Sequence, residues 1–315
     1  MSRLPVSRRR FLQGTSAATA VLAWNAAGLI HAETAGIHVA TNVYPWFTFF
    51  RREQRDFNAD LDASLAEVAA SGMDGFEPIL NSTEDVDRLA PLLKKHNLQM
   101  RSFYVNSVLH DAKAAEESIS RITTIARAAE DALATKIVVT NPSPKSWDRE
   151  ATDTSKNDAE LEIQAAALER LGAELAEAGL VLAYHNHDME LRNAAREFHH
   201  MMLATNPEHV TLCLDAHWMY RGCGNSQIAL FDIVELYGER VSEVHLRQSQ
   251  GGVWTEAFGT GDIDYPRLIR ALASKGVTQP HWVLEQAVEN GSPNTMNAIE
   301  AHRAGRKAFL AMVSN

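Results

Sequence analysis

Residues 180–191, LVLAYHNHDMEL, begin as an apolar run and end in a cluster of polar side chains. A buried strand of a parallel sheet has this appearance where it emerges at the carboxyl end of the sheet. Because side chains alternate along a strand, His185 and His187 share one face and Asn186 points to the other. The stretch therefore predicts a parallel strand that presents polar side chains at its end.

The same pattern recurs on three later apolar runs. TLCLDAHW (211–218) carries Asp215 and His217, SEVHLRQ (242–248) carries His245 and Arg247, and HWVLEQ (281–286) carries Glu285. The runs follow one another at about thirty to forty residues, close to the length of one strand-helix unit. A single histidine at a strand end is commonly structural, but four consecutive strand ends favour one divalent-metal site. The predicted ligands are His185, Asp215, His245 and Glu285.

Eight short apolar runs alternate with amphipathic helical segments. The expected strands are 37–44, 75–80, 98–105, 135–141, 180–187, 211–218, 241–248 and 281–286, and the expected helices are 60–71, 83–96, 112–134, 158–178, 194–204, 226–237, 265–275 and 294–313. This order predicts one (β/α)8 TIM barrel over residues 33–315. A doubly wound parallel sheet is the alternative, but its ligands would gather at one switch point rather than on four successive strands.

The overall composition is that of a globular chain with an acidic surface. The 315 residues are 45% hydrophobic and 22% charged, and the net charge is −10. The phosphate backbone of a nucleic acid binds surfaces with clustered Lys and Arg. A nucleic-acid partner is therefore not expected for a chain with this negative net charge.

The N-terminus matches a twin-arginine export signal. SRRRFLQ (7–13) carries the arginines, and residues 13–32 contain no charged side chain. We expect residues 1–32 to be a signal peptide recognised by the twin-arginine machinery, with a periplasmic or secreted mature protein; a weak membrane anchor is the alternative. Cys213 lies in an apolar strand and Cys223 in a glycine-rich loop, so an unpaired buried thiol and an unpaired loop thiol are expected.

Barrel enzymes carry their chemistry at the carboxyl ends of the strands. By that rule Glu77 is a further catalytic candidate, facing either the barrel mouth or solvent. The candidate substrate-binding residues are Trp46, Tyr104, Asn141, Trp218 and Trp254. The three tryptophans are expected on strand-end loops, where they stack on a sugar ring or simply pack.

Several segments together resemble the sugar phosphate isomerase/epimerase family of xylose-isomerase-like TIM barrels. They are YHNHDME (184–190), LDAHW (214–218), EVHLR (243–247), FGTGDIDY (258–265) and VLEQ (283–286), and HLR followed by FGTGDID is similar to the family's HxKD and GxGxxD patterns. The similarity extends from about residue 37 to the end of the chain. It implies a divalent ion, manganese by preference with zinc, cobalt or magnesium as alternatives, and a carbohydrate substrate; homo-oligomers are common among similar barrels.

The resemblance has one departure. Relatives place Glu, Asp, His and Glu on the last four strands, and these positions fall on His185, Asp215, His245 and Glu285. Epimerases of the family use two metal-bound glutamates, whereas this chain has His185 at the first position, which resembles inosose dehydratase-like lyases. Glu285 then remains as the carboxylate base, unless Glu190 or Glu77 supplies a second one.

A metal ion at these strand ends implies α-proton abstraction from a free keto sugar or sugar derivative through an enediolate. Glu285 or His217 would remove the proton, Arg247 would hold the oxyanion, and His187 is a further catalytic candidate. Reprotonation makes the enzyme an isomerase or epimerase, and loss of a β-group makes it a lyase acting on a keto sugar, inosose or 3-keto-glycoside. The export signal and the missing glutamate favour elimination slightly.

Two further functions are compatible with a barrel of this kind. A catalytically silent sugar-binding protein would keep the barrel without the reaction. A phosphodiesterase of the apurinic-endonuclease type shares the barrel, but its nucleic-acid substrate conflicts with the net charge of −10.

Overall fold

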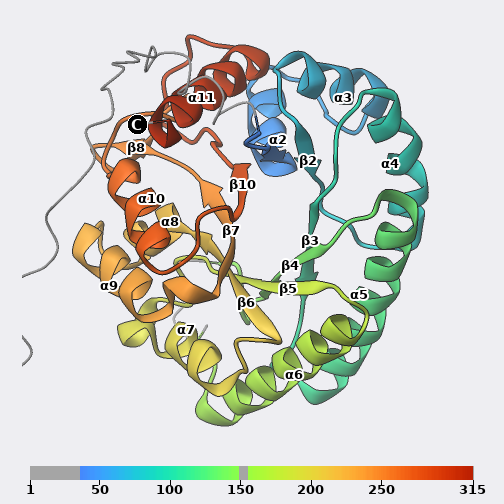
Figure 1. Ribbon diagram of the computed structural model, residues 1–315, viewed down its shortest axis with the longest axis vertical. Helices are drawn as coiled ribbons and strands as arrows, with labels where there is room; N and C mark the ends of the chain where they lie inside the picture. The colour runs from blue at the N-terminus through green and yellow to red at the C-terminus, as the bar shows by residue number, and fades with distance from the viewer. Residues whose placement is uncertain (1–35, 149–154, 315) are drawn as a thin grey trace, which may run out of the picture.

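The computed structural model describes residues 36–148 and 155–314, and it shows eight parallel strands surrounded by helices (Figure 1). The strands are β1 (Val39–Asn42), β2 (Gly75–Glu77), β3 (Ser102–Ser107), β4 (Ile137–Pro142), β5 (Val181–His185), β6 (Val210–Asp215), β7 (Val241–Leu246) and β10 (His281–Leu284). Their order in the sheet is β2-β1-β10-β7-β6-β5-β4-β3. β8 (Ser249–Gln250) and β9 (Val253–Trp254) form a separate antiparallel hairpin after β7.

The ends of this sheet meet, so the predicted barrel is confirmed. β2 and β3 are joined by bridges between Gly75 and Gln99 and between Ile79 and Tyr104. The amide of Tyr104 donates to the carbonyl of Pro78 at 2.8 Å. A Cβ on Gly75 would lie 2.5 Å from the carbonyl oxygen of Gln99, so only glycine allows the two backbones to approach this closely.

The helices form the outer ring (Figure 1). They are α2 (Val43–Arg52), α3 (Leu61–Ala70), α4 (Thr83–Lys95), α5 (Ala112–Leu133), α6 (Asp158–Glu177), α7 (Arg192–Ala204), α8 (Ala216–Gly222), α9 (Gln227–Tyr237), α10 (Tyr265–Ser274) and α11 (Ala298–Val313). Two of them, α2 and α8, begin directly at a strand end, where Asn42 and Asp215 cap them with their side chains. Residues 43–44 and 216–218, expected as strand or loop, are therefore helical.

Alternation along the strands divides the interior into two layers. Outward side chains and the inner faces of the helices make the large apolar core. The inward side chains include a small apolar group, Tyr104, Val139, Ala183 and Cys213, next to buried histidines and carboxylates. The polar chemistry of the barrel therefore lies inside it, toward the carboxyl ends of the strands.

Within the described ranges, none of the helices combines the length and apolar character that a membrane crossing requires. The expected signal peptide, residues 1–32, lies outside the described residues.

Candidate metal centre

Four strand-end side chains meet at one point in the barrel. His185 ends β5, Asp215 ends β6, His245 lies one residue before the end of β7, and Glu285 directly follows β10. One ligand atom from each lies within 4.8 Å of the others, and all four residues are buried. His185 Nε2 is 3.8 Å from Asp215 Oδ2, and His245 Nδ1 is 3.2 Å from Glu285 Oε2. The structure thus brings together the four residues that the sequence pattern selects.

The donor atoms in this cluster fit a cation. Both ring nitrogens of His185, Oδ2 of Asp215 and Nδ1 of His245 are buried and have no hydrogen-bond partner among the described residues. Buried polar atoms are normally satisfied, so three side chains whose unpartnered nitrogen and oxygen atoms face one another indicate a cation site. Two imidazoles and two carboxylates suit a divalent ion of the zinc or manganese type.

The ring of His245 is oriented by two glutamates on its far side. Its Nε2 lies 3.1 Å from Glu77 Oε1 and 3.0 Å from Glu243 Oε1. Asn42 Nδ2 and Ser102 Oγ each donate to Glu77, both at 2.6 Å. A carboxylate that accepts the proton of one imidazole nitrogen fixes the tautomer and leaves the other nitrogen for a metal. Nδ1 of His245 therefore faces Glu285 and is available as a ligand atom for a cation.

The two glutamates behind His245 hold different charges. Burial opposes ionisation of Glu77, but the charge and hydrogen bond of His245 hold its pKa well below the usual value. Burial, followed by the charge of Glu77, raises the pKa of Glu243 well above the usual value. The pair therefore carries one negative charge and one proton inside the barrel.

Arg247 keeps the carboxylate of Glu285 ionised. The guanidinium is buried, binds Glu285 Oε2 through Nη2, and donates from Nε to the carbonyl of Glu285 at 2.9 Å. Burial raises the pKa of Glu285, but the charges of Arg247 and His245 outweigh it and hold that pKa well below its usual value. The guanidinium carbon lies 5.0 Å from the ring centre of Trp218 and 4.5 Å from that of Trp254, within cation–π range. Nη1 of Arg247 has no hydrogen-bond partner in the described part of the chain, so it is available to an oxyanion.

A hydrogen bond from Trp254 fixes the tautomer of His217. Trp254 Nε1 donates to His217 Nδ1 at 3.3 Å, and an indole nitrogen cannot accept. Burial, followed by the charge of Arg247, lowers the pKa of His217 to about 3, so the ring is neutral. Its proton then sits on Nε2, which has no partner among the described residues. The sequence makes His217 a candidate base, but in this tautomer its Nε2–H is placed to donate a hydrogen bond.

Three other predicted residues lie beside the cluster. The ring centre of His187 is 4.8 Å from that of His185, and Tyr104 meets His185 edge-on at 5.3 Å. Asn141 Nδ2 donates to the carbonyl of His185 and to Glu190 Oε1, both at 3.0 Å. These contacts hold the end of β5 in place.

The predicted tryptophans separate into two groups. Trp218 and Trp254 pack against each other beneath Arg247. Trp46 lies instead on α2, fully buried, with its ring stacked 4.2 Å from that of His302. The expectation that Trp46 lies on a loop is wrong, because Asn42 starts a helix there, and the ring has no exposed face for a sugar.

Sequence reasoning missed two inward-facing residues of the cluster. Glu243 precedes His245 by two positions, and Cys213 precedes Asp215 by two, so the strand period places each on the same face as its neighbour. The two-residue repeat of side-chain direction along a strand could therefore have identified both residues from the sequence. Cys213 and Cys223 are both free, as expected.

The fold and the site together define a (β/α)8 barrel with a histidine and carboxylate cluster at the carboxyl ends of its strands. The chain belongs to the xylose isomerase-like TIM barrel family, whose model matches residues 65–309.

Individual relatives are distant. The chain is 24% identical over 271 residues to an inosose dehydratase of Clostridium botulinum (strain Alaska E43 / Type E3), a match that covers 78% of this chain and 87% of the relative. The structure of 3-keto-D-glucoside 4-epimerase from E. coli superposes with a TM-score of 0.65 at 14% identity, over 87% of this chain and 99% of that one. A xylose isomerase-like TIM barrel protein from Mycobacterium smegmatis in complex with magnesium gives a TM-score of 0.68 at 13% identity. The match covers 89% of this chain and 98% of that one. These structural likenesses support the barrel fold.

Proposed function

We propose that the protein is a divalent-metal-dependent enzyme that removes the α-proton of a keto sugar or keto polyol and then expels a β-hydroxyl group as water. The observation that carries the proposal is the convergence of His185, Asp215, His245 and Glu285 on one point inside the barrel, where atoms of the first three have no hydrogen-bond partner among the described residues. A bound divalent ion would polarise the substrate carbonyl and acidify the adjacent C–H bond. The preferred ion is manganese, as the family resemblance implies.

Glu285 is proposed as the base. Its carboxylate is ionised and lies beside the ligand cluster, and Arg247 binds it through one guanidinium nitrogen. When Arg247 donates its hydrogen bonds to the developing oxyanion instead, its interaction with the carboxylate of Glu285 weakens. Glu285 then becomes more basic. The α-proton then passes to Glu285, and the electron pair of the C–H bond enters the enediolate.

Elimination is favoured over epimerisation because the described site offers one carboxylate base. An epimerase of the two-glutamate type needs a second one on the opposite face of the sugar. Glu77 lies behind His245, and both oxygens of Glu190 already accept hydrogen bonds from Asn141 and the amide of His187. His217 carries a proton on Nε2 in the tautomer described above, and it is proposed to donate a hydrogen bond to the leaving hydroxyl group. The proton that Glu285 took up passes to that group, so that the β C–O bond breaks, water departs and Glu285 is ionised again.

Elimination and epimerisation both begin with removal of the α-proton, and the named relatives support both reactions. The distant relative in Clostridium botulinum is called an inosose dehydratase, which favours elimination. The similar folds include 3-keto-D-glucoside 4-epimerase and L-ribulose 3-epimerase, and these make isomerisation or epimerisation the second candidate function. Export by the twin-arginine route, which we propose from the sequence, would favour an unphosphorylated substrate in the periplasm.

The test uses the metal-free protein reloaded with Mn²⁺ in D₂O. Separate samples receive an inosose, a 3-keto-glycoside and a free ketose, and products are followed by mass spectrometry. Loss of water with deuterium incorporation supports the lyase, and an isomer of unchanged formula that carries deuterium supports the epimerase. Full metal loading without exchange on any substrate would count against both and favour a sugar-binding barrel.

A further inference from the structure

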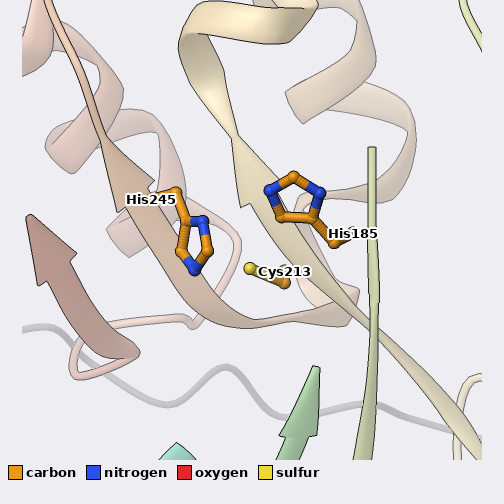
Figure 2. A group of neighbouring side chains, drawn as sticks. All are labelled: His185, Cys213 and His245. Carbon is orange, nitrogen blue, oxygen red and sulfur yellow. The ribbon is translucent and has the colours of Figure 1, made fainter. Parts of the chain in front are cut away.

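Cys213 places a sulfur atom between the two histidines of the metal cluster. Figure 2 shows its thiol between the rings of His185 and His245, and the three residues come from the neighbouring strands β6, β5 and β7. One ligand atom from each lies within 4.8 Å of the others. All three residues are 1% exposed or less. The cluster therefore offers sulfur as well as oxygen to a cation.

Cys213 lies one layer deeper in the barrel than Asp215. The two residues are two positions apart on β6, so their side chains share the inward face. Cys213 pairs in register with His185, and Asp215 pairs with His245. An ion bound to the two histidines can thus take its remaining ligands either from Asp215 and Glu285 or from Cys213.

The neighbours of Cys213 point to a ligand rather than to a simple packing role. Neither nitrogen of the buried His185 ring has a hydrogen-bond partner among the described residues. The thiol of Cys213 lies 3.7 Å from Glu243 Oε1, so it adjoins the Glu77–Glu243 pair, whose one negative charge can take up the thiol proton when sulfur binds a cation. A thiol that only filled space in the barrel would need neither the unpartnered nitrogens of His185 nor the contact with Glu243.

We propose that His185, Cys213 and His245 form a second coordination set, which selects a thiophilic divalent ion such as Zn²⁺, Co²⁺ or Cd²⁺. Thiolate sulfur and imidazole suit these ions, whereas carboxylate oxygen suits manganese and magnesium. As the metal–sulfur bond forms, the S–H bond breaks and the proton passes to the Glu77–Glu243 pair, which holds one negative charge and becomes neutral. Because the two coordination sets share both histidines, one ion excludes the other. A thiophilic ion therefore displaces Mn²⁺ from the carboxylate set.

Cobalt binding to the metal-free full-length protein tests this directly, without substrate. A Co²⁺–thiolate bond gives a charge-transfer band in the near ultraviolet, which ligation by nitrogen and oxygen alone does not give. We expect the band in the unmodified protein and in Asp215→Asn, which keeps the sulfur set. The band should be lost in Cys213→Ser and Cys213→Ala.

Cys223→Ala is the matched control, because it removes the other free thiol of the described chain from the loop after α8. It should keep the cobalt band. Circular dichroism confirms that each variant is folded, and Cys213→Ser serves as the closest replacement in size. Cobalt that binds without the band, cobalt that does not bind at all, or a band that survives in folded Cys213→Ser would each overturn the proposal.

Competition gives a second readout. Cd²⁺ should displace Mn²⁺ from the unmodified protein, measured as Mn²⁺ released into solution, and about tenfold or more Cd²⁺ should be required in Cys213→Ser. Equal displacement in the two proteins would contradict a sulfur ligand. Failure of the proposed reaction would leave both metal measurements unaffected, so the two proposals are tested separately.

Discussion

Nε2 of His245 lies 3.1 Å from Oε1 of Glu77, on the side of the ring opposite Glu285. The glutamate therefore positions the histidine without belonging to the ligand set. We expect Glu77→Ala to weaken Mn²⁺ binding by about 10- to 100-fold, because the ring loses its ionised acceptor and keeps only Glu243, the glutamate whose pKa is raised. Glu77→Gln, which keeps an acceptor oxygen but no charge, should fall between this variant and the unmodified protein.

Isothermal titration of Mn²⁺ into the metal-free protein measures this effect. Ser102→Ala is the control, because it removes one donor to Glu77 and leaves the contact with His245 intact. A folded Glu77→Ala protein with unchanged Mn²⁺ affinity would show that the contact with Glu77 is not needed and that Glu243 and packing suffice to hold His245.

His245 and Glu285 should contribute differently to metal binding and to removal of the α-proton. His245→Ala is expected to abolish both metal binding and activity, because it removes an imidazole ligand and leaves the charges of Glu77 and Glu285 without their partner. Glu285→Gln should retain part of the metal but slow exchange of the substrate α-proton by about 100-fold or more, since the amide is not a base. Metal content by mass spectrometry and deuterium exchange by NMR separate the two effects. Exchange at the normal rate in metal-loaded Glu285→Gln would assign the base elsewhere.

The barrel and its ligand cluster could be predicted because both depend on short periods in the sequence. Apolar runs ending in His185, Asp215, His245 and Glu285 specify the strand, its direction and the inward face. In a closed parallel barrel all such ends lie on the same rim. No contact between distant residues had to be known for that step.

The orientation of individual rings could not be predicted in the same way. Which nitrogen of His245 faces the ligand cluster depends on Glu77, which lies on a strand far away in the sequence. Residues 43–47 are β-branched and aromatic apart from Pro45 and are typical of a strand, yet the side chain of Asn42 caps a helix that carries Trp46 into the outer core. Such outcomes depend on single hydrogen bonds, which a hydrophobic pattern does not encode.

A structural carboxylate makes the stability of the protein depend on pH. The buried Glu256 accepts hydrogen bonds from Arg52, from the amides of Thr295 and Met296, and from the Thr295 hydroxyl group. Burial opposes ionisation, but the amide donors outweigh it and lower the pKa of Glu256 below its usual 4.5. The stabilisation is therefore complete above that value and disappears as the pH falls through the lowered pKa.

Glu256→Gln should accordingly reduce the free energy of unfolding by about 2 kcal/mol at pH 7, because the charged acceptor is lost. The difference from the unmodified protein should shrink under acidic conditions, where Glu256 is itself protonated. Urea denaturation at neutral and acidic pH measures it. The partly exposed Glu67, which pairs with Arg55 at the surface, provides the control through Glu67→Gln, which should change little. A pH-independent difference for Glu256→Gln would mean that packing, and not charge, stabilises this loop.

The hydrogen bond from Trp254 to His217 separates the two halves of the proposed reaction. If Nε2–H of His217 stabilises the departing hydroxyl group by a hydrogen bond, His217→Phe should reduce loss of water by about 100-fold or more and leave α-proton exchange at Glu285 largely intact. Trp254→Phe should have a smaller effect in the same direction, since it frees His217 to adopt the tautomer that cannot donate from Nε2. Water loss and deuterium exchange measured in one D₂O incubation give the ratio of the two rates. An equal fall in both rates for His217→Phe would place His217 before the enediolate forms, as the base rather than the hydrogen-bond donor to the leaving group.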